Sequence, residues 1–100
     1  MSIDPTLIRL RGGPKQGRYV YSFPDGSEAE MDFFESRPGV VTITHTGTPR
    51  QHRGQGVAAT LVARAVEDFR TAGQKVIPAC WFARDQFAEH PDWADLLYRG

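Results

Sequence analysis

The sequence has only one cysteine, Cys80, among its 100 residues. A lone cysteine excludes an internal disulfide and a cysteine-rich zinc site. The three histidines share no metal-ligand spacing, so the sequence predicts no metal centre. A chain without disulfides is typical of a reducing compartment, and we expect a cytoplasmic location.

Net charge is also lacking, because 12 Lys and Arg residues balance 12 Asp and Glu residues. A nucleic-acid partner held by overall charge is therefore not expected. No apolar run is long enough to cross a bilayer. The first residues also lack the basic-then-apolar layout of a secretory signal, so we expect no membrane partner. The pattern leaves the oligomeric state open.

Hydrophobic residues make up 40% of the chain, which is enough for one packed domain. Three runs in the first half combine alternation with β-branched and aromatic residues, and they are separated by turn signals such as Asp25-Gly26. The predicted strands are Arg18 to Phe23, Glu28 to Ser36 and Val40 to Thr46. They should form an antiparallel meander.

The segment before these strands allows two interpretations. Its "TLIRLR" stretch alternates weakly, as an edge strand does, whereas "GGPKQG" is typical of a flexible loop. We expect residues 1–17 to form a flexible N-terminal extension and residues 18–100 to form a single domain.

The second half changes its period. Val57, Leu61, Ala65 and Phe69 recur every four residues, which predicts an amphipathic helix from Gly54 to about Ala72.

A strand follows in "KVIPACWF", residues 75–82, and Pro78 predicts an edge position because proline cannot donate to a ladder. The tail predicts one or two short helices interrupted at Pro91. A strand–helix–strand unit is normally parallel and right-handed. The predicted fold is therefore α+β, with a mixed sheet, one long helix across it and short C-terminal helices.

A glycine-containing loop, "GTPRQHRGQG", joins the third strand to the long helix. The first turn of a helix has unpaired N–H groups and a partial positive charge, and glycine lets an anion approach the backbone. Arg50 and Arg53 would add charge-assisted bonds. Taken alone, the spacing fits a phosphate site and also a plain helix entry with solvated arginines, and it matches neither a Walker A loop nor the dinucleotide fingerprint.

The residues from Gln51 to Gly56 read Q-x-x-G-x-G, and this stretch resembles the acetyl-CoA pyrophosphate loop of the GNAT superfamily of acetyltransferases. Three further features resemble the short, single-domain YjdJ-like branch of that superfamily. They are His45-Thr46 before the loop, Pro78-x-Cys80 after the helix and His90-Pro91 in the tail. The similarity covers roughly residue 18 to the end. It implies a GNAT-like fold in which the strands on either side of the helix splay apart.

The resemblance also implies a cofactor, acetyl-CoA or CoA, and the residues that would bind it. Backbone N–H groups from residue 51 to residue 57 would bind the CoA pyrophosphate, and the strand ending at His45-Thr46 would pair with the pantetheine arm. The implied cofactor-binding residues are Thr46, Gln51, His52, Arg53, Gly54, Gln55, Gly56 and Val57. The resemblance leaves His52 either as a solvated loop residue or as a contact at the rim of the phosphate site.

Two residues are candidates for catalysis. In the resembling branch Cys80 would act as an acyl or proton acceptor, and the alternative is a packed, small hydrophobic residue at a strand end. His45 would act as a general base, and the alternative is a hydrogen-bonded strand histidine. His45 alternates in phase with Val41 and Ile43, which predicts that it shares their buried face.

Four aromatic residues near the predicted gap would either cover the cofactor arm or belong to the core. They are Trp81, Phe82, Phe87 and Trp93.

The predicted function is acetyl-CoA-dependent N-acetylation of an amine, either a small molecule or a protein amine. The alternative is a CoA-binding or acyl-CoA-binding regulatory module without catalysis, because the strands that complete larger GNAT enzymes are missing. A nucleic-acid adaptor that uses Arg50, His52 and Arg53 is a third reading, and the zero net charge speaks against it.

Overall fold

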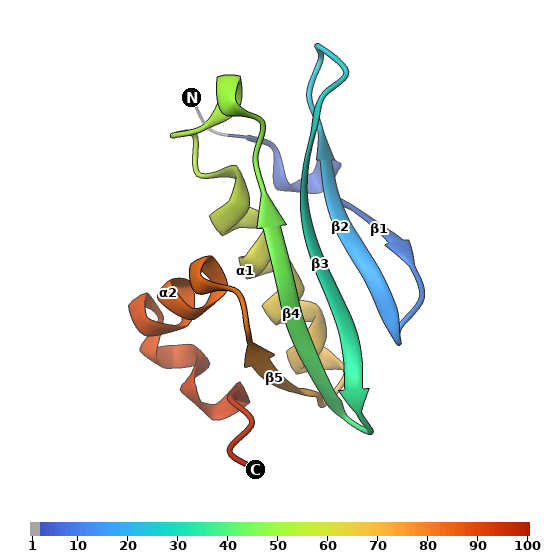
Figure 1. Ribbon diagram of the computed structural model, residues 1–100, viewed down its shortest axis with the longest axis vertical. Coiled ribbons are helices and arrows are strands. Elements are labelled where there is room, and N and C mark those ends of the chain that lie inside the picture. Colours follow the sequence, from blue (N-terminus) through green and yellow to red (C-terminus); the bar gives the residue numbers. More distant parts are fainter. Residues whose placement is uncertain (1–2) are drawn as a thin grey trace.

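The computed structural model describes residues 3–100 and contains one five-stranded sheet in the order β1-β2-β3-β4-β5 (Figure 1). The strands are β1 (Arg9–Gly12), β2 (Gln16–Ser22), β3 (Glu28–Arg37), β4 (Val40–Gly47) and β5 (Lys75–Pro78). The α-helices are α1 (Val57–Thr71) and α2 (Trp81–Glu89), and short 3₁₀ helices span Pro5–Leu7, Arg50–His52 and Pro91–Leu96. This mixed architecture confirms the predicted fold class.

The core lies between one face of the sheet and α1. Ala29, Met31 and Phe33 of β3 alternate toward this face and are at most 4% exposed, because side chains two residues apart share a face of a strand. Leu61 and Ala65 of α1 are fully buried against them. The predicted meander and the apolar stripe of the long helix are both confirmed.

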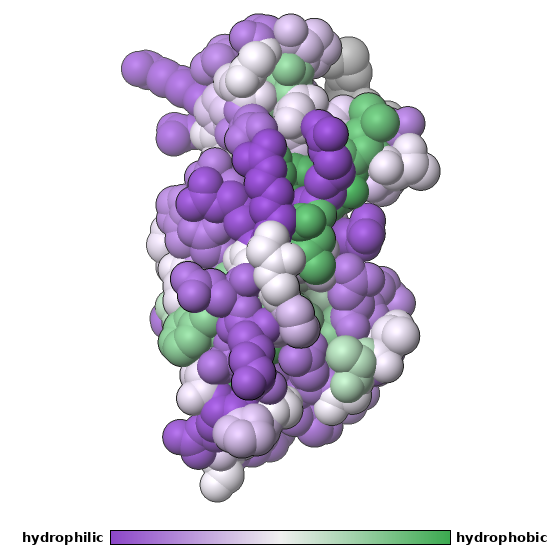
Figure 2. All heavy atoms as spheres, turned by 90° about the vertical axis from the view of Figure 1, so that its right-hand side faces the viewer, coloured by the Kyte–Doolittle hydropathy of each residue, from purple (hydrophilic) through white to green (hydrophobic). Residues whose placement is uncertain are grey.

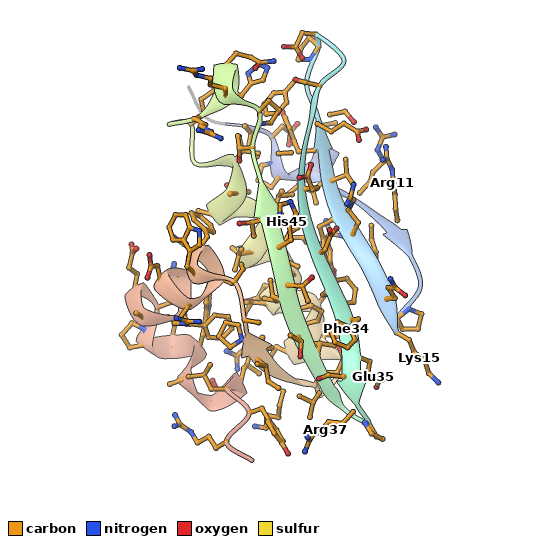
Figure 3. The ribbon with its side chains drawn as sticks, in the orientation of Figure 1. Arg11, Lys15, Phe34, Glu35, Arg37 and His45 are labelled. Atoms are coloured by element: carbon orange, nitrogen blue, oxygen red, sulfur yellow. The ribbon has the colours of Figure 1, made fainter. Side chains whose placement is uncertain are left out.

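The side of the molecule formed by β1 and β2 is mostly hydrophilic, with isolated hydrophobic patches (Figure 2). Two ion pairs contribute to it. Arg11 lies 2.6 Å from Glu28, and Arg18 lies 2.6 Å from Asp32. We call the sheet face away from α1 the open face, and Figure 3 views the sheet from that side.

A β-bulge interrupts β4 near its end. Asp32 is paired with His45 and Phe33 is paired with Ile43, so Thr44 is the extra residue of the bulge. One extra residue shifts the side-chain alternation by one position. The bulge therefore places His45 on the open face, and the prediction that His45 shares the buried face of Val41 and Ile43 is wrong.

Strands β4 and β5 are parallel, and their ladder ends at the pair Ile43–Pro78. Residues 44–47 of β4 extend beyond this pair, so the two strands separate there. The edge position of β5 is as Pro78 predicts, although the C-terminal segment covers part of this edge through a bridge from Val76 to Leu97.

Two predicted boundaries are wrong. Helix α1 begins at Val57 instead of Gly54, because Gly54 and Gly56 have positive φ angles of 87° and 75°, which a right-handed helix does not contain. Strand β5 stops at Pro78 instead of continuing to residue 82, because Cys80 is the N-cap of α2 and its sulfur accepts a hydrogen bond from the amide of Ala83.

The N-terminal segment includes the edge strand that the sequence allowed. Residues 9–12 pair antiparallel with residues 17–20 of β2, and Ile8 is 4% exposed in the core. The predicted flexibility of residues 1–17 stays a prediction, and residues 1 and 2 of that extension lie outside the described residues. Of the helices in residues 3–100, none combines the length and the apolar character that crossing a membrane requires.

Candidate functional site

A groove of about 570 Å³ lies where the end of β4, the start of α1 and the start of α2 meet. Helix α2 supplies Trp81, Phe82 and Gln86 to its wall. The other lining residues belong to two stretches. One contains residues 46–48 and the loop that follows them, and the other is the first turn of α1. They are Thr46, Gly47, Thr48, His52, Arg53, Gly54, Gly56, Val57, Ala58 and Ala59. Six of the eight residues implied for cofactor binding thus line one groove, and Gln51 and Gln55 do not.

The groove is lined by backbone donors at the start of α1. Within residues 3–100, no group accepts a hydrogen bond from the amides of residues 54–59, and no side chain caps the helix. Gly54 and Gly56 adopt the left-handed conformation that glycine permits, and their lack of side chains leaves this backbone accessible. Unpaired N–H groups and the helix dipole together make a site that favours an anion.

The loop before these glycines is a short 3₁₀ helix, Arg50–His52. The amide of His52 donates to Pro49, and the amide of Arg53 donates to Arg50, both within the turn. These two amides are therefore already used. An anion in the groove would be held by the amides that follow, from Gly54 onward.

His52 anchors this loop to the turn between β2 and β3. Its ring stacks on Phe23 with centroids 3.7 Å apart, and its Nε2 donates to the Asp25 carboxylate over 2.8 Å. The side chain of His52 is 18% exposed, so the reading as a solvated residue is wrong. The contact holds the glycine loop against the body of the sheet.

Hydrogen bonds from the Ser27 hydroxyl and amide, and then from His52, hold the pKa of the Asp25 carboxyl well below its ordinary value of 3.8. A carboxyl whose pKa is lowered by folding stabilises the folded protein above its ordinary pKa, and this contribution is lost as the pH falls further. We therefore expect the Asp25–His52 contact to be intact at neutral pH.

Replacing Asp25 tests whether this contact supports the groove. We expect Asp25→Ala to weaken CoA binding about threefold to tenfold, a modest loss because solvent screens this exposed contact and the loop keeps its other contacts. Isothermal titration calorimetry measures the change. Ser27→Ala is the matched control, because it keeps the carboxylate that His52 contacts. Equal affinities for Asp25→Ala and the wild type would contradict the anchoring role.

The two loop arginines contribute unequally to the groove. Arg53 lines it, and its Nε donates to the backbone oxygen of Thr48 over 3.4 Å. Arg50 is exposed and does not line the groove. Both glycines of the loop line the groove, whereas only one of the two arginines does.

The four aromatic residues divide between the two predicted roles. Trp81 is 71% exposed and lines the groove together with the half-buried Phe82. Phe87 and Trp93 are buried in the core at 7% and 5% exposure. Trp81 and Phe82 are therefore available to cover a ligand, whereas Phe87 and Trp93 pack in the core.

Cys80 lies at the point where β4 and β5 separate. Its amide donates to the backbone oxygen of Ile43 over 3.2 Å, and its Sγ accepts from the amide of Ala83 over 3.4 Å. The half-buried side chain packs against the core and does not line the groove. These contacts favour the structural alternative, in which the thiol caps α2.

His45 also lies outside the groove lining, on the open face of β4 next to Thr46, which does line it (Figure 3). Its side chain is 53% exposed, and its Nε2 lies 3.0 Å from the Glu30 carboxylate. The structure thus separates His45 and Cys80, because His45 projects from the open face and Cys80 packs at the junction of β4 and β5. Within residues 3–100, no group of three or more His, Cys, Asp and Glu side chains is arranged to hold a metal ion.

Comparisons with known proteins bear on the family and the fold. Residues 18–96 match the family model described as GCN5-related N-acetyl-transferase. The chain is also similar to a GCN5-like candidate N-acetyltransferase from Staphylococcus aureus solved by NMR, with 22% identity and a TM-score of 0.70 over 93% of this chain and 90% of that one. At this identity the second comparison supports the fold alone. No curated protein matches the sequence at a significant level.

Proposed function

We propose that this chain, which belongs to the GCN5-related N-acetyltransferase family, transfers an acetyl group from acetyl-CoA to an amine. One observation carries the proposal. Residues with unpaired amides at the start of α1 line a groove that also contains residues 46–48, where β4 has lost its β5 partner. An anion site and an unpaired strand edge are thus available to one extended ligand.

Each part of the groove has a proposed role in binding acetyl-CoA. The amides from Gly54 to Ala59 would hold the pyrophosphate, since anions are favoured at a helix N-terminus. The edge of β4 at Thr46 would pair with the amide groups of the pantetheine arm. Trp81 and Phe82 would cover that arm and exclude water from it.

His45 is the proposed proton acceptor of the transfer. It would take the proton that the attacking amine loses as its nitrogen bonds to the acetyl carbon and the carbon–sulfur bond breaks. Backbone N–H groups at the separated strands would hold the thioester oxygen as negative charge develops there. The identity of the amine, a cytoplasmic location and membership of the YjdJ-like branch stay predictions from the sequence.

A second candidate is a CoA-binding module that does not catalyse transfer. It is favoured by the observation that neither His45 nor Cys80 lines the groove. The two candidates share the cofactor and differ in turnover. Thiol release from acetyl-CoA, followed with a panel of small amines and lysine peptides, separates them. Release that requires an amine supports the enzyme, and binding without release across the panel supports the module.

Cys80 provides a further test of the mechanism. We expect Cys80→Ala to keep the rate of acetyl transfer within about threefold of the wild type while lowering the free energy of unfolding by about 1 kcal/mol, the usual cost of a lost helix cap. Steady-state kinetics and denaturant unfolding measure the two effects. A large loss of turnover in a folded variant that still binds CoA would assign Cys80 to catalysis instead.

A further inference from the structure

The open face contains a pair of side chains that the sequence analysis did not connect, His45 of β4 and Glu30 of β3. We propose that Glu30 is a positioning residue that fixes the orientation and tautomer of His45, so that His45 can accept the proton of the amine. This inference rests on the proposed acetyl transfer. It assigns Glu30 a positioning role, for which Gly47 provides the space.

The backbone brings the pair together through the bulge at Thr44. Without the bulge, His45 would share the buried face of Ile43 and could not reach a side chain of the open face. With the bulge, His45 is in register with Asp32, and Glu30, two residues away on β3, projects from the same face. The bulge therefore has a specific result, because it re-aims one histidine toward one carboxylate.

The contact determines which imidazole nitrogen carries the proton. Glu30 Oε2 lies 3.0 Å from His45 Nε2, and an ionised carboxylate can only accept a hydrogen bond. In the neutral ring Nε2 is consequently the donor, and Nδ1 keeps the lone pair that accepts a proton. The Glu30 side chain is 23% exposed and the His45 side chain is 53% exposed, so the carboxylate is held in the sheet while the ring faces solvent.

Gly47 provides the space for this contact. Gly47 is opposite Glu30 in the ladder, and a Cβ added at Gly47 would overlap Glu30 Oε2 and come within 3.1 Å of His45 Nε2. A methyl group there would force the carboxylate away from the ring. The absence of a side chain at position 47 is therefore part of the arrangement.

The open face also provides an approach for the acceptor. A second hollow of about 590 Å³ lies on this face, and Asp32, Phe34 and Thr44 are among its lining residues. Thr44 precedes His45, and Thr46, the residue after His45, lines the groove on the other side. An amine on the open face would thus meet His45 at the strand edge that borders the proposed acetyl-CoA groove.

Long-range ¹H–¹⁵N NMR correlations of the His45 ring, recorded at a pH where the ring is neutral, test the inference without any ligand. We expect the Nε2–H tautomer in the wild type and a mixture of tautomers in both Glu30→Ala and Gly47→Ala. The second variant retains both members of the pair, so it isolates the effect of space. Glu35→Gln and Gly13→Ala are matched controls, because the Glu35 carboxylate accepts from the amide of Gly39 instead of a histidine and an added Cβ at Gly13 meets no atom within 4 Å.

Kinetics provide the second readout. We expect kcat to fall about tenfold to a hundredfold in Glu30→Ala and Gly47→Ala, which is a fraction of the roughly 10²- to 10⁴-fold that general acid–base catalysis contributes. KM for acetyl-CoA should stay unchanged in Glu30→Ala, since Glu30 does not line the groove. An Nδ1–H tautomer in the wild type, or an unchanged tautomer in both variants, would overturn the inference. If the wild type transfers no acetyl group, the proposed function fails separately, and the tautomer measurement still decides whether Glu30 positions His45.

Discussion

Gly54→Asp is expected to weaken the binding of CoA at least 100-fold, a free-energy change of about 2.7 kcal/mol or more. Gly54 has a φ of 87° and lines the groove, and its amide has no internal acceptor within residues 3–100. Aspartate would add a negative charge where the pyrophosphate is proposed to bind. It would also disfavour the left-handed conformation by about 1–2 kcal/mol. Calorimetric titration with CoA measures the loss.

Gly39→Asp is the control for this variant. Gly39 has a φ of 76° in the turn between β3 and β4, and an added Cβ meets no atom within 4 Å at either position. Both variants therefore add the same charge and a similar backbone strain, and only one does so in the groove. Normal binding by a folded Gly54→Asp variant would show that the loop is not the pyrophosphate site.

His45→Gln is expected to lower kcat about 10²- to 10⁴-fold, the usual contribution of a general base. Glutamine keeps a donor for Glu30 but cannot accept a proton at neutral pH. The dissociation constant of CoA should stay unchanged, since His45 does not line the groove. Steady-state kinetics with an amine that the wild type accepts measure kcat, and calorimetry measures the affinity.

Glu35→Gln is the control here too, because Glu35 is also on β3 but lines neither the groove nor the hollow on the open face, and its carboxylate accepts from the amide of Gly39. We expect a kcat near that of the wild type for this variant. Wild-type turnover in a folded His45→Gln variant would remove His45 from the mechanism and leave the proton to water or to another group.

Much of the fold was predictable because its signals are local. Alternation over residues 28–36 and the four-residue period from Val57 to Phe69 depend on the chain itself, and both elements form as the pattern predicts. The predicted ends of elements are wrong where a glycine conformation or a helix cap sets the boundary, as at the start of α1 and the end of β5. The sequence includes Gly54 and Gly56 in the helical pattern, but their positive φ angles delay α1 until Val57.

The candidate site was predictable in its loop and not in its contacts across the sheet. The glycine spacing located the loop that precedes α1, and six of the implied residues line the groove there. The bulge at Thr44 leaves no signal in a short run of β-branched residues, so the face of His45 was predicted wrongly. Without that face, Glu30 could not be recognised as its neighbour.

The anchor of the loop was missed for a similar reason. In the sequence, Asp25 is part of a turn signal and Phe23 is the end of a predicted strand. Their contacts with His52 join residues 27 and 29 positions apart, and no local pattern predicts such contacts. The turn between β2 and β3 is rich in hydrogen-bonding groups, which is the one signal in the sequence for such a contact. It points to the loop only when the position of the β2–β3 hairpin relative to that loop is known.

The most direct test of the proposed site is a titration of the ¹⁵N-labelled protein with CoA, followed by amide NMR shifts. The proposed binding mode predicts saturable shifts concentrated at the amides of residues 54–59, with a second group at residues 46–48 and the Trp81 indole. No shifts at millimolar CoA, or shifts confined to the hollow on the open face, would contradict it.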